Sequence, residues 1–330
     1  MNYLLVDGLN MFMRAKHVGG KGSIDMKIGM AMHIMFNSIN KCWREFDGNH
    51  IVLCLEGRSW RKDFYEPYKR NRSDARAAQT EQQQEEDKVF WEMFDEWKDF
   101  VTNKTNCSVL HHPDLEADDL IAGWVQAHPK DNHVIVSTDG DFAQLIAPNV
   151  KQYNGVSNTI ITHEGYFDDK KKKPVLDKKT GEPKAAPNPA FMLFEKCMRG
   201  DTSDNVFSAY PGVRTKGTRN KVGLQEAFED KDTKGYNWNN LMLQRWVDHN
   251  GIEHRVLDDY NRNVLLCDLT AQPDNIRFLI DQTIDRVQEK KVSQVGMRLM
   301  KFCAQWDLQR ILENANSYAD MLNSNYKKVK

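Results

Sequence analysis

The sequence predicts an α/β protein with a mainly parallel sheet in its first part and helices in its second part. Three short apolar runs, Tyr3–Val6, His50–Leu55 and His133–Ser137, are separated by long segments with helical spacing of apolar residues. Strands that alternate with helices in this way are typical of parallel sheets. Beyond residue 190 helical patterns dominate and apolar strand-like runs vanish, so we expect two domains, 1–190 and 191–330.

The segments between these runs have readable patterns of their own. Apolar residues at helical spacing predict a helix over Ile24–Phe46, and an aromatic face predicts another over Ala77–Phe100. A further helix should begin at Glu116, and Val150–Thr162 is β-rich. The Lys/Pro-rich stretch from 168 to 189 suits an exposed loop. Helical patterns are then expected over Ala190–Arg199, Lys221–Phe228, Trp238–Asn250, Val256–Asp268 and Asp281–Lys330.

Composition excludes several classes of protein. The 330 residues carry a net charge of -1, which says nothing about partners until the charges are mapped. The six cysteines are scattered without a CxxC pair, so we expect reduced, buried thiols and no zinc site. No stretch is apolar enough to span a membrane. A cytoplasmic protein is the expectation.

Acidic residues follow all three apolar runs. Asp7, Glu56 and Asp139 end them, and Asp141 follows two residues later. In open α/β sheets ligands bind beyond the carboxyl ends of the strands, where these side chains would meet. A second group of acids lies at the start of the helix expected from residue 116. The acids of a third group are three residues apart, so they would lie on one face if their segment were helical. These two groups are Glu116, Asp118 and Asp119, and Asp201 and Asp204.

Each acidic group also has a structural explanation when taken alone. Acids in the first turn of a helix act as caps, and Asp-Gly after a strand is ordinary turn chemistry. The joint pattern favours a site for divalent cations, because so many carboxylates in one place would otherwise repel each other. Two cations about 4 Å apart, as in phosphoryl-transfer enzymes, would account for the number of acids.

Two basic segments flank the acidic groups. Residues 58–76 combine cations, among them Arg61, Lys69, Arg70 and Arg72, with aromatic residues such as Tyr68. Phosphate-neutralising cations beside rings that can stack on bases are typical of nucleic-acid binding, although a solvated helical face would have the same composition. The second segment runs from a glycine turn towards a helix, and it is either a phosphate site or a connecting loop. Its cations are Arg214, Lys216, Arg219 and Lys221.

The motifs VDGLN, LEGRSWRKDF, YKRNR, EADD, STDGDFAQL and GDTSDN occur in this order over roughly residues 1–230. In this order the chain resembles the 5′-nuclease (flap endonuclease) family. The resemblance implies a PIN-like core, with a mixed, mainly parallel sheet flanked by helices. It also implies a helical arch at about 60–90 and a DNA-binding helix–three-turn–helix at about 200–230, within the helical C-terminal part.

The resemblance also implies roles for individual residues. Two Mg²⁺ ions, for which Mn²⁺ can substitute, would be bound by acids: Asp7, Glu116, Asp118 and Asp139 at the first, and Asp141, Asp201 and Asp204 at the second, with Asp119 less direct. Lys69 and Arg72 would stabilise the scissile phosphate, and Tyr68 would offer a stacking surface.

Two positions depart from the family's pattern. Glu56 stands where the family usually has Asp, which points to a longer or water-mediated metal contact. Arg214 replaces the second glycine of the family's tighter hairpin, and this puts a monovalent-cation site there in doubt.

The function implied is 5′→3′ exonuclease, flap endonuclease and RNase H activity on DNA and RNA·DNA duplexes. It would remove RNA primers during phage replication in the bacterial host cytoplasm. The C-terminal YKKVK is either a solvated tail or a contact for a replication partner such as the phage single-stranded DNA-binding protein. The alternatives are a PIN-like ribonuclease, which lacks the arch and the Asp201/Asp204 module, and a non-catalytic DNA-binding module.

Overall fold

The computed structural model describes residues 1–18 and 23–327, and these form two compact units. The first unit comprises residues 1–59, 79–187 and 274–330, and the second comprises residues 60–78 and 188–273. The prediction of a single domain boundary near residue 190 is therefore wrong for the last helices, which belong to the first unit. They do so because they share its hydrophobic core, to which Leu299, Ile311 and Met321 contribute.

The first unit is built on a seven-stranded sheet with the order β3-β2-β1-β4-β5-β6-β7. β1, β2, β3, β4 and β5 pair in parallel, whereas β6 and β7 are antiparallel. The predicted mixed, mainly parallel sheet is thus confirmed. The strands are β1 (Asn2–Asp7), β2 (His50–Cys54), β3 (Ser108–Leu110), β4 (Asn132–Val136), β5 (Val150–Asn154), β6 (Thr159–Thr162) and β7 (Gly165–Asp168).

Helices cover both faces of this sheet, which explains why its strands are continuously apolar. Leu4 and Val6 of β1 point into a core shared with α2, α5 and α12. Tyr3 lies on the other face, where its ring meets Trp124 of α6 edge-on at 5.3 Å. The helices are α1 (Gly8–Val18), α2 (Ile24–Glu45), α5 (Glu81–Lys104), α6 (Ala117–Ala127), α11 (Asp274–Asp285), α12 (Val295–Gln305), α13 (Gln309–Leu312) and α14 (Ala315–Leu322).

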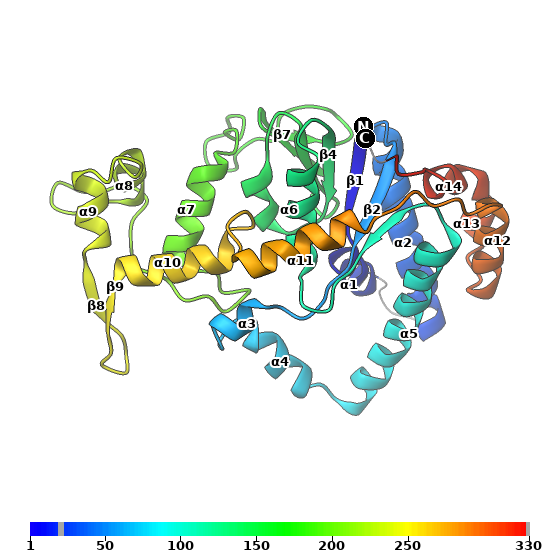
Figure 1. The fold of residues 1–330 in the computed structure, drawn as a ribbon, viewed down its shortest axis with the longest axis horizontal. Coiled ribbons are helices and arrows are strands. Elements are labelled where there is room, and N and C mark those ends of the chain that lie inside the picture. The colour runs from blue at the N-terminus through cyan, green and yellow to red at the C-terminus, as the bar shows by residue number, and fades with distance from the viewer. Residues whose placement is uncertain (19–22, 328–330) are drawn as a thin grey trace. The chain divides into compact units, whose positions relative to one another are not determined.

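The C-terminal helices complete the first unit. α11 packs along α6, where Gly123 leaves room for Ile280. α12, α13 and α14 pack against α2 and α5 (Figure 1). The predicted helices at 24–46 and 77–100 correspond closely to α2 and α5, and the predicted carboxylate-headed helix corresponds to α6.

The second unit is mainly helical, with a core that includes Phe194, Trp238 and Tyr260. The prediction of a helix over 238–250 is wrong beyond Met242, because the helix ends there and the hairpin of β8 and β9 follows. Its turn has Gly251 at φ 81° and Asp248 accepting hydrogen bonds from backbone amides, both of which oppose helix continuation. The elements are α3 (Arg61–Phe64), α4 (Arg70–Ala77), α7 (Pro189–Arg199), α8 (Leu224–Glu229), α9 (Tyr236–Met242), β8 (Arg245–Val247), β9 (Glu253–Arg255) and α10 (Val256–Cys267).

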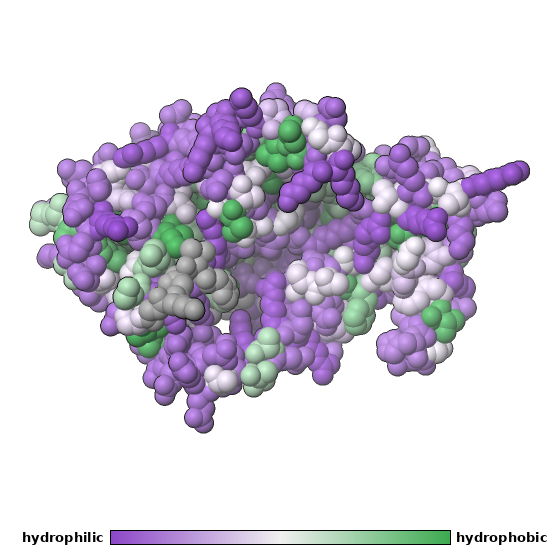
Figure 2. Space-filling view, turned by 180° about the vertical axis from the view of Figure 1, so that it is seen from behind, coloured by the Kyte–Doolittle hydropathy of each residue, from purple (hydrophilic) through white to green (hydrophobic). Residues whose placement is uncertain are grey.

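Among the described residues, no helix is both long and apolar enough to cross a membrane. The face drawn in Figure 2 is largely hydrophilic, with small hydrophobic patches scattered over it.

Candidate active site

The first unit gathers acidic side chains at the point where the strand order reverses. β2 and β4 flank β1 on opposite sides, so a crevice is expected at the carboxyl ends of β1 and β4. Asp7 ends β1 and is 5% exposed. Its Oδ1 accepts a 3.1 Å hydrogen bond from the amide of Asn10, and its Oδ2 accepts one of 2.9 Å from Ser137 Oγ. These donors fix the orientation of the carboxylate.

A cluster of three carboxylates lies in the same unit. Asp118, Asp139 and Asp141 each place one carboxylate oxygen within 4.8 Å of the others, and all three are partly exposed. Such a group of oxygen donors is suited to a divalent cation. Asp118 comes from the first turn of α6, whereas Asp139 and Asp141 follow β4.

Backbone geometry brings Asp139 and Asp141 together. Asp139 caps the 3-10 helix Gly140–Leu145, and its Oδ1 accepts a 2.9 Å hydrogen bond from the amide of Asp141. The carbonyl of Asp139 accepts a 2.6 Å hydrogen bond from Gln152 Nε2 on β5. The segment is therefore held in place at both its backbone and its side chain.

The remaining acids at the head of α6 are buried. Glu116 is 1% exposed and accepts a 2.7 Å hydrogen bond from Ser59 Oγ, while Asp119 is fully buried and accepts one of 3.2 Å from the amide of Glu116. Asp119 therefore takes part in capping the helix. Glu56, which follows β2, also caps this helix, since its Oε2 accepts a 3.0 Å hydrogen bond from the amide of Ala117.

The electrostatic field of this acidic group reaches the end of β2. Burial raises the pKa of the Cys54 thiol well above its usual range, and the charges of Asp7 and Asp118 raise it further. Cys54 is therefore a neutral thiol next to the acids, and the donor set of the cluster consists of oxygen atoms.

Asp201 and Asp204 lie in the second unit on a turn and not on a helix, but one carboxylate oxygen of each still lies within 4.8 Å of the other, as expected for acids that point the same way. Two backbone hydrogen bonds of 2.8 and 2.7 Å between Asp201 and Val206 close this turn. Gly200 precedes it at φ 76°, where a Cβ would lie 2.3 Å from the carbonyl oxygen of Val206. Burial alone would raise the pKa of Asp201, but hydrogen bonds from Lys196 and Ser203 lower it to about 2.

Three predicted site residues converge on Asp204. Tyr68 donates a 3.0 Å hydrogen bond to Oδ2, Arg72 Nη2 lies 2.5 Å from Oδ1, and Lys69 Nζ lies 3.7 Å from Oδ2. The Lys69 backbone, at φ 54°, also donates a 2.8 Å hydrogen bond to the carbonyl of Asp204. The two cations and their counter-charge thus form one preorganised cluster, which we call the Asp204 cluster (Tyr68, Lys69, Arg72, Asp204).

The other predicted nucleic-acid contacts of residues 58–76 differ in exposure. Arg61 is 1% exposed, and its Nε donates a 2.9 Å hydrogen bond to the carbonyl of Leu266. Tyr68 is also buried, at 4% exposed. Arg70 is exposed and pairs with Glu66 at 3.2 Å. In this conformation Arg61 and Tyr68 serve the packing of the second unit, while Arg70 is available at the surface.

The second basic segment forms an exposed loop that ends at α8. Glu226, which the sequence analysis did not single out, holds the loop by accepting 3.0 Å hydrogen bonds from the amides of Gly217 and Gly223. A Cβ on Gly223 would lie 2.3 Å from the nitrogen of Gly217, so this crossing requires glycine. The four cations predicted to bind nucleic acid are all exposed: Arg214, Lys216, Arg219 and Lys221.

The residues that orient the acids were not among those predicted from the sequence. Ser137, Asn10 and Gln152 bind the strand-end carboxylates or their backbone. Ser137 belongs to the STDGD motif, and Asn10 belongs to VDGLN, so their proximity to the acids was a usable signal. Gln152 lies in the β-rich stretch without any motif.

Comparison with known proteins identifies the family. A family model described as the N-terminal, resolvase-like domain of 5′-3′ exonucleases matches residues 2–174. Ribonuclease H of Enterobacteria phage T4 is 27% identical over 274 residues, which are 76% of this chain and 75% of that protein. The flap endonuclease of Escherichia phage T5 is 29% identical over 157 residues, 46% of this chain and 51% of the relative.

Solved structures agree on the fold. A structure of the phage T5 flap endonuclease, described as a pseudo-enzyme-product complex with DNA and metal ions, has a TM-score of 0.57. The match covers 97% of this chain and all of that chain at 17% sequence identity. With a family model that spans more than half of its length, the chain belongs to the 5′-3′ exonuclease family.

Proposed function

We propose that this chain is a divalent-metal-dependent, structure-specific nuclease that hydrolyses phosphodiester bonds near 5′ ends and flaps of DNA and RNA·DNA duplexes. The observation that carries the proposal is the cluster of Asp118, Asp139 and Asp141, in the unit whose sheet reverses its order next to Asp7. The chain belongs to a nuclease family, and its relatives include proteins named ribonuclease H and flap endonuclease.

The donor set fits a hard cation. Carboxylate oxygens from three partly exposed aspartates suit Mg²⁺, with Mn²⁺ as a substitute, and the adjacent thiol of Cys54 is neutral. We propose that Asp118, Asp139 and Asp141 hold the metal together with Asp7. When bound, divalent cations acidify water and stabilise negative charge on phosphate oxygens. Asp201 and Asp204 are proposed as further metal ligands.

Glu56 and Asp119 are proposed to act through position. Both accept hydrogen bonds from amides at the start of α6, and they thereby fix the helix turn that carries Asp118. Glu116 is held by Ser59 and faces the same turn. A carboxylate placed at a helix N-terminus is stabilised by the helix dipole, so Glu116 and Asp119 tolerate their burial.

Lys69 and Arg72 are proposed to stabilise charge on the scissile phosphate. Both are held beside Asp204, so their positions are set before substrate arrives. Charged groups that need no reorganisation during the reaction stabilise its transition state most effectively. Arg70 and the cations of the 214–221 loop are proposed to bind the phosphate backbone, which positions duplexes without reading sequence. Arg61, because it is buried, is proposed to have a structural role.

The proposed biological role is removal of RNA primers in phage DNA replication, in the cytoplasm of the bacterial host. The similarity to the T4 protein named ribonuclease H supports this role. A T5 flap endonuclease structure that contains DNA and metal ions supports the class of substrate and cofactor. The segment proposed to contact a replication partner ends in residues 328–330, which lie outside the described residues.

The test is cleavage of 5′-labelled flap DNA and RNA·DNA hybrids with Mg²⁺, with EDTA, and by the Asp139→Asn variant. We expect cleavage with Mg²⁺ that disappears in EDTA and falls at least about 100-fold in Asp139→Asn, because the variant removes a charged oxygen ligand. Asp320→Asn is the matched control, since Asp320 is exposed on α14.

Three outcomes would contradict the proposal. Cleavage that persists in EDTA would exclude the metal mechanism. Cleavage of structureless RNA without cleavage of flaps or hybrids would favour a PIN-like ribonuclease. Tight binding of flaps without any cleavage would favour a non-catalytic DNA-binding protein.

A further inference from the structure

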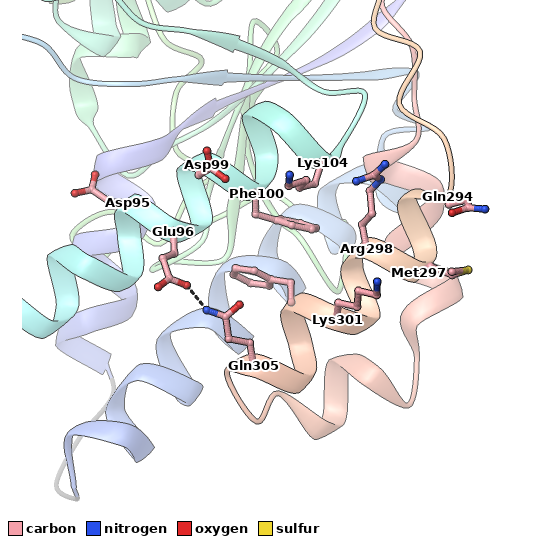
Figure 3. Close-up of a pocket in the computed structure, with 11 residues that line it drawn as sticks. Asp95, Glu96, Asp99, Phe100, Lys104, Gln294, Met297, Arg298, Lys301 and Gln305 are labelled. Atoms are coloured by element: carbon pink, nitrogen blue, oxygen red, sulfur yellow. Dashed lines mark hydrogen bonds between the residues drawn. The ribbon is translucent and has the colours of Figure 1, made fainter.

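A groove of about 650 Å³ lies between α5 and α12 in the first unit, and none of its lining residues belongs to the acidic site (Figure 3). The two aromatic rings that line it, Phe100 and Phe302, are only 4% and 6% exposed. Its acids and cations are equal in number: Asp95, Glu96, Asp99, Lys104, Arg298 and Lys301. A groove with balanced charge and covered aromatic rings favours no class of ligand.

The buried amide of Gln152, in contrast, lies directly behind the acidic site. Gln152 is 1% exposed on β5, where its partners in the sheet are Ile135 of β4 and Ile161 of β6. The next residue of the strand, Tyr153, points into the core shared with α2 and α5, so Gln152 lies on the opposite face of the sheet. Burial of an amide among apolar neighbours is unfavourable unless its polar atoms are hydrogen-bonded. A residue that served packing alone would be apolar at this position.

Only the nitrogen end of this amide is hydrogen-bonded. Nε2 donates to the carbonyl oxygen of Ser137 at 3.1 Å and to that of Asp139 at 2.6 Å. Oε1 is buried and accepts no hydrogen bond within the described part of the chain. The reverse orientation would turn Oε1 towards two carbonyl oxygens, so these acceptors determine which way the amide points. Since an unpaired buried acceptor disfavours folding, the two N–H donors are the part of Gln152 that the structure uses.

Both carbonyls belong to the segment that carries Asp139. Ser137 Oγ joins this segment to β1, because it accepts a 3.1 Å hydrogen bond from the amide of Asp139 and donates one of 2.9 Å to Asp7 Oδ2. Between these residues, the amide of Thr138 donates a 3.1 Å hydrogen bond to Asn10 Oδ1. Gln152 therefore holds the backbone on which the orientation of the Asp7 and Asp139 carboxylates depends.

We propose that Gln152 is a positioning residue that raises the affinity of the acidic site for a divalent cation by fixing the Ser137–Asp139 backbone. The inference rests on the proposed function, because it takes Asp7 and Asp139 as metal ligands. Gln152 is buried, so it acts through this backbone and not by contact with substrate. Removal of a group that orients metal ligands typically lowers metal affinity or activity by about 10- to 100-fold.

The experiment is titration of the full chain with Mn²⁺ in the absence of nucleic acid, with free Mn²⁺ measured by electron paramagnetic resonance. Gln152→Met has a similar shape but no N–H donor, and it should weaken Mn²⁺ binding at least about tenfold. Gln152→Asn keeps the amide but is one methylene shorter, so it should also weaken binding. It decides the test if far-UV circular dichroism shows that Gln152→Met is not folded. At saturating Mn²⁺ both variants should cleave flap DNA within about threefold of the wild-type rate, because they keep every proposed ligand.

Tyr153→Phe is the matched control, at the next residue of the same strand. It removes a hydroxyl that is hydrogen-bonded to Lys41 and Asp169 on the opposite face of the sheet. Urea unfolding in EDTA should show that this variant is less stable than the wild type, whereas its affinity for Mn²⁺ should be unchanged. The control therefore separates positioning of the metal ligands from a general loosening of β5.

Each contrary result has its own meaning. Equal Mn²⁺ affinities of the wild type and the folded Gln152 variants overturn the inference and leave the proposed function intact. An equal loss of Mn²⁺ affinity in Tyr153→Phe also overturns it, because loosening of β5 would then be sufficient. A cleavage rate that stays low at saturating Mn²⁺ overturns the positioning role in favour of a role in the chemical step. Absence of Mn²⁺ binding by the wild type contradicts the proposed function and, with it, this inference.

Discussion

Glu56, two residues beyond the end of β2, accepts a 3.0 Å hydrogen bond from the backbone amide of Ala117, the first residue of α6. This contact links a strand end directly to the helix turn that carries Asp118. It gives Glu56 a structural role, because its side chain reaches the N-terminus of the helix. Glu56 therefore supports α6 as a cap.

We predict that Glu56→Ala lowers the free energy of unfolding by about 1 kcal/mol even without metal, which is the typical effect of removing a helix cap. Glu56→Gln retains an acceptor oxygen and should lose less. Urea unfolding in EDTA measures both values. Wild-type stability of Glu56→Ala in EDTA, combined with weaker metal binding, would show that Glu56 acts as a metal ligand and has no capping role.

Lys69→Ala should reduce the rate of the chemical step far more than the affinity for substrate. Lys69 is buried and held against Asp204, so its ammonium group is fixed in position to interact with charge on the scissile phosphate. Loss of one such preorganised group typically costs about 100-fold in rate. Single-turnover cleavage gives the rate, and anisotropy in EDTA gives the affinity, which should change less than about threefold.

The control for this prediction is Lys62→Ala, which removes an exposed cation from the short helix α3. It should leave the single-turnover rate unchanged. Equal losses of rate and affinity in Lys69→Ala would show that Lys69 is an ordinary backbone contact of the substrate.

The strand-end acids could be predicted because buried parallel strands leave an unmistakable apolar run, and the polar residue that stops each run marks the sheet edge. Asp7 and Asp139 could be located in this way. That they lie next to the reversal of strand order could not be predicted, because it depends on the pairing of β1 with β4. The three-residue strand β3 is too short to give a pattern.

Exposure in the basic segments could not be predicted. Arg61 and Tyr68 have side chains that are apolar along their length and polar at the tip, so the same residues suit a core or a surface. The spacing of Asp201 and Asp204 was compatible with a helix, but Gly200 and the backbone bonds of Asp201 with Val206 fix a turn instead. Glu226 gave no signal because its partners are backbone amides.

Stability should fall as the pH falls from about 6.5 to 4, because two buried histidines can bind a proton in this range only when the chain unfolds. Burial lowers the pKa of His50 and of His133 from 6.5 to about 4. Between these values the unfolded chain binds more protons than the folded one, so protonation favours unfolding, and the stabilisation is complete only above 6.5. Each histidine contributes at most about 3 kcal/mol to this loss.

Urea unfolding at a series of pH values measures this dependence. His133→Asn should reduce its slope between pH 6.5 and 4, whereas His249→Asn should not, because His249 is exposed. A free energy of unfolding that stays constant over this range would show that neither buried histidine is forced to remain neutral in the folded chain.

We predict that the cations of the 214–221 loop contribute to the salt dependence of the affinity for duplexes. Lys216 and Arg219 are exposed on the loop held by Glu226, and each is proposed to neutralise one phosphate of a duplex. Each contact releases counterions, so replacing either residue with alanine should reduce the slope of log affinity against log salt concentration by about 0.9. Anisotropy with flap DNA in EDTA over a range of salt concentrations gives this slope. Lys151→Ala, outside the loop, should leave it unchanged, and an unchanged slope in both loop variants would place the duplex elsewhere on the protein.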